Sequence, residues 1–149
     1  MNASSFPKQV LFACTLNTVR SVMAEAVFNA RFGALSMAQS CGVMGRLADG
    51  FALAVLTERG LPVKEEEPRI FTSFSADDFD QVITLSAQAA EAARIWLGAN
   101  GQHKHHYWHI TEPSGLEVPR AQKLAEYRLI CDEIERKLDS HFGSFVKKT

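Results

Sequence analysis

Short apolar runs and stretches of helical periodicity alternate along the chain. "VLFA" (10–13) is continuously apolar, which is the pattern of a strand buried on both faces. The segments "LSMAQS" (35–40), "FDQVITLS" (79–86) and "HHYWHI" (105–110) predict three further strands. Between the strands, apolar residues recur at helical spacing over about 20–33, 49–60 and 86–97, so these segments are predicted helices.

The predicted helices carry start and stop signals. Asp49 and Ser86 are residue types that cap helix N-termini, and Gly33 and Gly60 are typical of helix ends. Pro119 suits the first turn of a last, long helix. The apolar residues of that helix repeat at alternating spacings of three and four: Leu124, Tyr127, Cys131, Ile134 and Leu138. The segment 61–69, "LPVKEEEPR", is typical of a solvated connection.

Strands that alternate with helices imply right-handed crossovers and a parallel sheet. We therefore expect an α/β fold, a three-layer sandwich with a four-stranded parallel sheet and helices on both faces. The 149 residues are most naturally one domain, 1–149. Ligands bind such folds beyond the carboxyl ends of the strands, where the sequence places Cys14.

Composition excludes several classes of function. A formal net charge of -1 gives no general attraction to nucleic acid or to an anionic membrane. No apolar stretch approaches the length that spans a bilayer, and the N-terminus lacks the pattern of a signal peptide, so we expect a cytoplasmic protein. The three cysteines, Cys14, Cys41 and Cys131, fit neither a disulfide framework nor a four-cysteine zinc site. The histidines of 103–109 have no neighbouring carboxylate or cysteine to complete a ligand set, so we expect no metal and no organic cofactor.

The loop between the first strand and the first helix carries the chemistry. The strand ends in Cys14, and Arg20-Ser21 opens the helix that follows. A helix N-terminus has unpaired N–H groups and a positive dipole end, so it binds anions, and the guanidinium matches two phosphate oxygens. The same field favours thiolate over thiol, and Ser21 is placed to donate a hydrogen bond to the sulfur. The loop has neither the ending of a nucleotide P-loop nor a dinucleotide fingerprint. A small core cysteine is the alternative explanation of Cys14.

"CTLNTVRS" (14–21) resembles the C-x5-R-S phosphate-binding loop of the low-molecular-weight protein tyrosine phosphatase family. "SCGV" (40–43) is similar to the turn after the family's second strand, "FDQVITLS" to its third strand and "WHITEPSG" (108–115) to its late acid loop. The resemblance implies a phosphomonoester hydrolase of the protein tyrosine phosphate type, in which Cys14 attacks phosphorus and forms a phosphocysteine. It implies as substrate a phosphorylated protein or a small aryl phosphate. The oligomeric state stays open.

The resemblance also implies roles for individual residues. Arg20 would hold the phosphoryl oxygens, Asn17 would adopt a left-handed conformation that ties the loop together, and Ser21 would stabilise the thiolate. Glu112, followed by Pro113, stands where the family has the aspartate of an Asp-Pro pair, and would be the general acid. The implied phosphate-binding residues are Thr15, Leu16, Asn17, Thr18, Val19, Arg20 and Ser21.

Three features depart from the family pattern. Leu16 stands in place of a glycine, and its side chain either narrows the mouth of the site or lies on the outer side of the loop. Val19 stands where many relatives have a second cysteine. Cys41 is either a core residue or a neighbour of the site. The aromatic residues that line the family's pocket are absent from "GVMGRLADG" (42–50) and after Pro113, which removes stacking worth about 0.5–1.5 kcal/mol per ring.

These departures leave two alternatives to the phosphatase. One is a module of the same fold that binds phosphate or a phosphoprotein with weak or no turnover. The other is arsenate reduction, since related arsenate reductases share the loop and the fold. Those reductases use further cysteines after the third strand, and "TLSAQAAEAARIW" (84–96) has none, which disfavours a reduction coupled to the chain's own thiols.

Overall fold

The centre of the fold is a four-stranded, entirely parallel sheet in the order β2–β1–β3–β4. The computed structural model describes residues 6–61 and 67–147, with side chains as far as residue 143. The strands are β1 (Gln9–Cys14), β2 (Met37–Gly42), β3 (Gln81–Thr84) and β4 (His105–Tyr107). The central pair, β1 and β3, ends at the edge where Cys14 leaves the sheet.

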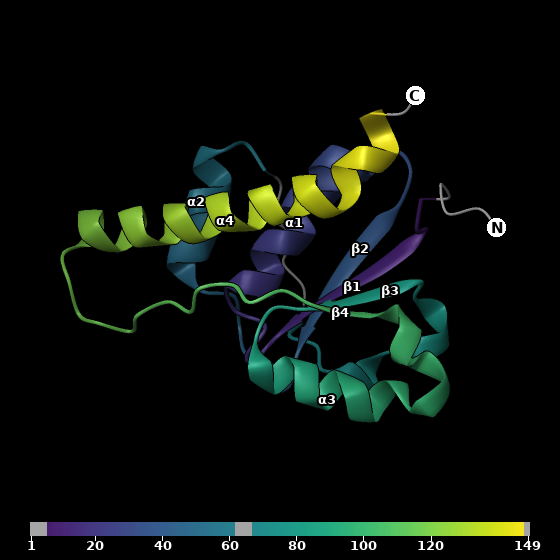
Figure 1. The fold of residues 1–149 in the computed structure, drawn as a ribbon. Helices are drawn as coiled ribbons and strands as arrows, with labels where there is room; N and C mark the ends of the chain where they lie inside the picture. Colours follow the sequence, from purple (N-terminus) through teal and green to yellow (C-terminus); the bar gives the residue numbers. More distant parts are fainter. Residues whose placement is uncertain (1–5, 62–66, 148–149) are drawn as a thin grey trace.

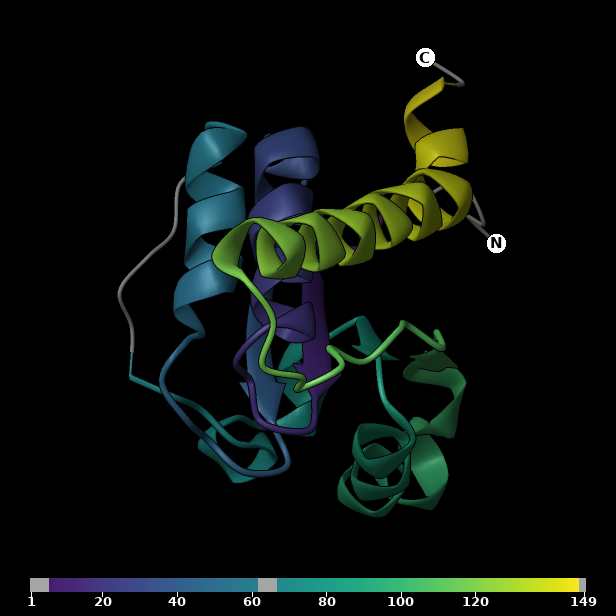
Figure 2. The same ribbon diagram turned by 90° about the vertical axis from the view of Figure 1, so that its left-hand side faces the viewer.

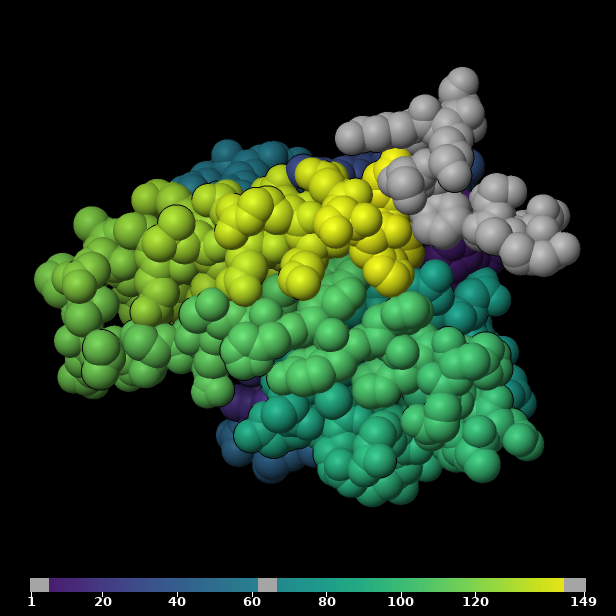
Figure 3. Space-filling model, viewed as in Figure 1, coloured from purple at the N-terminus to yellow at the C-terminus, as the bar shows by residue number. Residues whose placement is uncertain are grey.

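Helices cover both faces of the sheet (Figure 1). The helices α1 (Arg20–Phe32), α2 (Gly50–Glu58) and α4 (Arg120–Lys147) lie on one face, and α3 (Ala87–Leu97) lies on the other. Helix α4 crosses over α1 and α2 and contacts both (Figure 2). The space-filling view shows α4 above the part of the molecule that contains α3 and β4 (Figure 3). Short 3-10 turns, η1 (Phe71–Ser73), η2 (Ala76–Asp78) and η3 (Ala99–Lys104), complete the connections around α3. The predicted three-layer α/β sandwich is confirmed.

The burial of β1 explains its continuous apolar run. Val10 and Phe12 face the core under α1 and α4, while Leu11 and Ala13 face the smaller core under α3, and all four are fully buried. Side chains of a strand alternate between faces, so a central strand covered on both sides requires apolar residues at every position. The Cys14 side chain faces the core under α1 and α4.

The predicted helix starts hold, whereas two of the strands are shorter than predicted. Asp49 caps α2 by accepting hydrogen bonds from Phe51 N and Ala52 N, and Ser86 caps α3 by accepting one from Ala89 N. β2 begins and ends two residues later than predicted, β3 has four residues rather than eight, and β4 has three rather than six. Of the predicted connection 61–69, residues 62–66 lie outside the described part of the chain. Within 6–61 and 67–147, no helix is both long and apolar enough to cross a membrane.

Candidate active site

Residues 15–19 curl between the end of β1 and the start of α1 with their carbonyl groups turned outward. The carbonyl oxygens of Cys14, Thr15, Leu16 and Thr18 accept hydrogen bonds from the N–H groups of Val43, Met44, Arg46 and Asp49, at 3.0–3.2 Å. No acceptor for the N–H groups of residues 15–19 is found among the described residues. A loop with bonded carbonyls and unbonded N–H groups is a concave anion site of the nest type.

Gly42 lets the segment 43–49 approach this loop. A Cβ atom at Gly42 would lie 2.4 Å from the Met44 oxygen, 2.7 Å from the Asn17 nitrogen and 2.8 Å from the Leu16 carbonyl carbon. All three distances are shorter than van der Waals contact, and two of the atoms belong to the loop backbone. The glycine of "SCGV" is therefore required by the close approach of two backbones.

The thiol of Cys14 is held at the centre of the loop by Ser21. Cys14 is only 2% exposed, and its Sγ lies 3.0 Å from Ser21 Oγ and 3.4 Å from the Ser21 N–H. Asn17 Nδ2 donates to Ser21 Oγ at 2.8 Å. Ser21 Oγ accepts from Asn17 and keeps its own hydrogen, which is then available to the sulfur.

Asn17 fixes the shape of the loop. It has a φ of 59°, and among the described residues it alone combines a side chain with a positive φ. Asparagine tolerates this left-handed conformation better than most residues. Its Nδ2 also donates to Ser40 Oγ of β2 at 3.1 Å, and its Oδ1 accepts from the Arg69 N–H at 3.5 Å. The left-handed conformation implied by the family resemblance is present, and Asn17 joins the loop to β2 and to the segment just before η1.

Arg20 lies beneath the loop and is 8% exposed. Its Nη1 donates to the carbonyl oxygens of Leu85, at 3.2 Å, and Ile110, at 3.3 Å. These two carbonyls follow β3 and β4, so the guanidinium is oriented by the ends of neighbouring strands. The bonds occupy Nη1, and no acceptor for Nε or Nη2 is found in the part of the chain that the structure describes. The edge that a guanidinium forms with Nε and Nη2 matches two oxygens of a phosphate.

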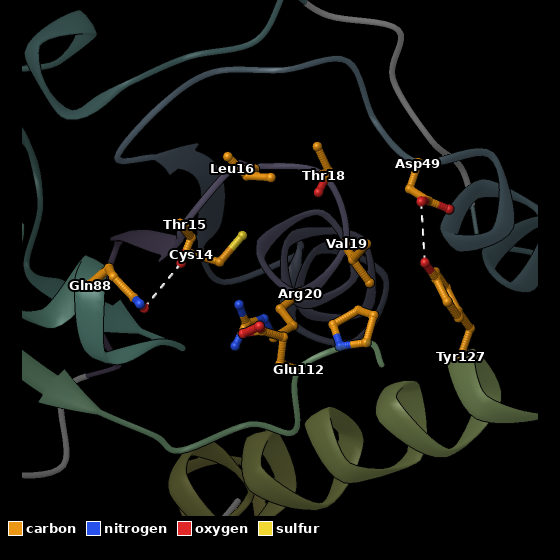
Figure 4. Close-up of a pocket in the computed structure, with 11 residues that line it drawn as sticks. Cys14, Thr15, Leu16, Thr18, Val19, Arg20, Asp49, Gln88, Glu112 and Tyr127 are labelled. Atoms are coloured by element: carbon orange, nitrogen blue, oxygen red, sulfur yellow. Dashed lines mark hydrogen bonds between the residues drawn. The ribbon is translucent and has the colours of Figure 1, made fainter. Parts of the chain in front are cut away.

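A cavity of about 350 Å³ opens over the loop (Figure 4). Cys14 lies near its centre, with Leu16 and Thr18 on one side and Arg20 and Glu112 on the other. Glu112 and Pro113 come from the segment that connects β4 to α4, and the Glu112 side chain is exposed. The structure thus brings the predicted acid to the mouth of the same pocket that holds the thiol.

The pocket contains three residues that the sequence did not point to. Gln88 enters from the first turn of α3, Asp49 from the start of α2 and Tyr127 from α4. Tyr127 OH donates to Asp49 Oδ2 at 3.2 Å, and burial together with the Asp49 charge raises the pKa of Tyr127 to about 12. The sequence showed Asp49 only as a cap and Tyr127 only as part of an apolar stripe, and nothing in it marked Gln88.

The departures from the family pattern now have places in the structure. Leu16 is half-buried and lines the pocket, so it narrows the mouth, whereas Val19 is buried in the core with one edge at the pocket. Cys41 pairs in register with Ala13 and belongs to the core under α3, on the face of the sheet opposite to Cys14, and burial raises the pKa of its thiol. Cys131 is buried beneath α4, where burial raises the pKa of its thiol to about 11.

The histidines near β4 have separate partners. His105 Nε2 lies 2.8 Å from Thr84 Oγ1, His106 packs edge-on against His141, and Tyr107 OH lies 3.3 Å from His109 Nδ1. Among the described residues, no three side chains of His, Cys, Asp or Glu are placed to hold a metal ion.

Residues 9–149 match the family model described as low molecular weight phosphotyrosine protein phosphatase. The chain belongs to this family. It is similar to the glutaredoxin arsenate reductase of Synechocystis sp., with 28% identity over 134 residues that cover 89% of this chain and 95% of that protein. Among solved structures, an arsenate reductase from Archaeoglobus fulgidus is 36% identical, with a TM-score of 0.71 over 90% of this chain and 98% of that chain.

The YwlE arginine phosphatase from Geobacillus stearothermophilus has a TM-score of 0.78 over 95% of both chains. At 21% identity, this likeness shows a common fold. The proteins that resemble this chain are therefore named for two kinds of activity, arsenate reductase and arginine phosphatase. The choice between them depends on the chemistry of the site.

Proposed function

We propose that the protein hydrolyses phosphomonoesters, with phosphotyrosine-like aryl phosphates as the preferred class, through a phosphocysteine on Cys14. The observation that carries the proposal is the buried thiol bonded to Ser21 at the centre of a loop whose N–H groups have no acceptor among the described residues. Such a loop binds a phosphoryl dianion and holds a nucleophile in line with its phosphorus.

In the first step the Cys14 thiolate attacks phosphorus while the bond to the leaving oxygen breaks. The loop N–H groups and the free edge of Arg20 hold the three equatorial oxygens as charge spreads over them. Glu112 donates a proton to the leaving oxygen, and in the second step its carboxylate takes a proton from water as that water displaces the sulfur. Glutamate has the chemistry of the family's aspartate with one more methylene, and Pro113 restricts the backbone that carries it.

The family that the chain matches is described by phosphotyrosine, which supports an aryl substrate. Tyr127 lines the cavity, but its side chain is only 3% exposed and packs against Phe51 at a centroid distance of 5.7 Å, so its ring offers a substrate little surface. The proposed aryl preference therefore rests on the family and not on an aromatic wall of the pocket.

The test is hydrolysis of p-nitrophenyl phosphate by wild type, Cys14→Ser and Glu112→Gln. We expect no measurable turnover from Cys14→Ser and a loss on the order of 100-fold from Glu112→Gln, because general acid catalysis contributes roughly 100- to 10,000-fold. Equal activity of wild type and Cys14→Ser would contradict the proposal. Tight phosphate binding by a wild type that does not hydrolyse the substrate would instead identify the phosphate-binding module.

Arsenate reduction is the second candidate, because the Archaeoglobus and Synechocystis relatives are named for it. Arsenate has the tetrahedral shape of phosphate and suits the same loop. Its reduction requires two thiol electrons, and the other two thiols of the chain, Cys41 and Cys131, are buried away from the pocket. A reductase built on this site therefore needs an external thiol. Arsenite formation with added glutathione and glutaredoxin, absent in Cys14→Ser, would favour this candidate over the phosphatase.

A further inference from the structure

The second step of the proposed reaction needs a water molecule held opposite the Cys14 sulfur. In the first step the leaving oxygen is fixed by the substrate to which it is bonded. A water molecule has no such attachment, and a displacement of about 1 Å can lower a rate on the order of 100-fold. One proton of the water goes to Glu112, so a second polar group is needed to fix the position of its oxygen.

Most polar side chains of the pocket are engaged elsewhere. Tyr127 and Asp49 bond to each other, and Arg20 donates to the carbonyl oxygens of Leu85 and Ile110. Thr18 belongs to the loop itself. Gln88 differs, because it enters the pocket from α3, outside the phosphate-binding loop (Figure 4).

Gln88 is anchored through its carbonyl oxygen. Thr15 Oγ1 lies 3.4 Å from Gln88 Oε1 and 3.0 Å from Ser86 Oγ, and Ser86 is itself buried as the cap of α3. Thr15 Oγ1 is the donor toward both oxygens, so its one proton is shared between Ser86 Oγ and Gln88 Oε1. With the carbonyl held in this way, the amide nitrogen of Gln88 keeps two N–H donors, for which the described residues offer no acceptor.

We infer that Gln88 positions the water that hydrolyses the phosphocysteine, an inference that rests on the proposed phosphatase function. An amide N–H of Gln88 donates to one lone pair of the water, and the Glu112 carboxylate accepts one of its protons. The other lone pair attacks phosphorus, the P–S bond breaks, and its electron pair returns to the Cys14 sulfur, where Ser21 and the loop stabilise the thiolate. The products are inorganic phosphate and the free enzyme.

Gln88 then acts only on the hydrolysis of the phosphocysteine, so its removal should lower kcat and leave kcat/KM nearly unchanged. The ratio kcat/KM reports binding and formation of the phosphocysteine, whereas kcat also includes its hydrolysis. We expect Gln88→Ala to lower the rate of dephosphorylation about 10-fold and to leave kcat/KM for p-nitrophenyl phosphate within about twofold of wild type, since one orienting contact is lost. Alanine is the strongest helix former, so α3 keeps its start.

The experiment is stopped-flow release of p-nitrophenol, with the phosphorylated protein measured by intact mass after acid quenching. Gln88→Ala should show a burst near one equivalent, a lower steady-state rate and a larger phosphorylated fraction than wild type. Glu91→Ala is the matched control, because Glu91 lies one turn further along α3, is exposed and pairs with Arg94, and it should behave as wild type.

Two outcomes would overturn the inference. If wild type turns over and Gln88→Ala has the same burst and the same kcat, Gln88 does not position the water. If Gln88→Ala lowers kcat and kcat/KM equally, its role is structural or in substrate binding. A wild type that never forms a phosphocysteine removes the proposed function itself, which is a different result from either of these.

Discussion

The hydroxyl of Ser21 should stabilise the Cys14 sulfur as nucleophile and as leaving group, and its removal measures the contribution of that one hydrogen bond. Ser21→Ala removes the 3.0 Å contact to the sulfur and keeps the 3.4 Å contact from the backbone N–H. Asn17 Nδ2 retains Ser40 as an acceptor, so the left-handed turn of the loop is preserved. The substitution therefore changes one hydrogen bond to a charged atom and little else.

The expected magnitude follows from that single bond. A hydrogen bond to a charged group contributes about 1.5–3 kcal/mol, and each 1.4 kcal/mol is about a factor of ten. The kcat/KM of Ser21→Ala for p-nitrophenyl phosphate should accordingly be about 10- to 100-fold lower than that of wild type at the same pH.

The assay compares kcat/KM of wild type and variant at one pH, with thermal unfolding as a check on the fold. Ser40→Ala is the matched control: it removes a hydroxyl from the same Asn17 without touching the sulfur, and it should lower kcat/KM much less. If Ser21→Ala has the kcat/KM of wild type, the Ser21 hydroxyl does not stabilise the sulfur. The proton direction inferred from Asn17 would then be wrong.

Three further outcomes are expected. Asp49→Asn keeps the helix cap but removes a negative charge from the pocket wall, so inorganic phosphate should inhibit at about two- to fivefold lower concentration. Asp49→Ala also removes the cap of α2, so it should lower Tm as well. Gly42→Ala forces a Cβ against Met44 and Asn17, so denaturant titration should show a loss of about 1–3 kcal/mol, and equilibrium dialysis should show weaker phosphate binding. Burial lowers the pKa of His141 to about 4, below its value in the unfolded chain. The unfolded state therefore binds more protons, and the free energy of unfolding falls as pH drops from about 6.5 toward 4. His141→Gln should reduce this loss by roughly 1 kcal/mol, measured by denaturant titration at acidic and neutral pH, and an unchanged pH slope would contradict the assignment.

Much of the fold was predictable because its signals are local. The continuous apolar run of β1 follows from its two covered faces, and the caps at Asp49 and Ser86 follow from the hydrogen bonds that a helix start requires. The edges of the elements were less accurate. β2 extends to Gly42 rather than ending at residue 40, because its last residues pair with the apolar end of β1, which lies far away in the sequence.

That extension also decided the place of Cys41. The sequence left it either in the core or near the site, since it stood just beyond the predicted strand. In the structure it pairs with Ala13 and faces α3, and the alternation of side chains along a strand puts it on the opposite face from Cys14. The sheet therefore separates the two thiols, which is why the chain's own cysteines offer no resolving partner in the pocket.

The sequence by itself determined the chemistry of the anion loop. Its thiol, asparagine, arginine and serine lie within eight residues, between a strand end and a helix start, and the N–H groups of a helix start attract an anion. Only the tertiary structure decided what surrounds that loop. Glu112, Gln88 and Tyr127 come from three separate segments, and they meet at the pocket because the parallel sheet gathers the ends of its strands at one edge while α4 packs across α1 and α2.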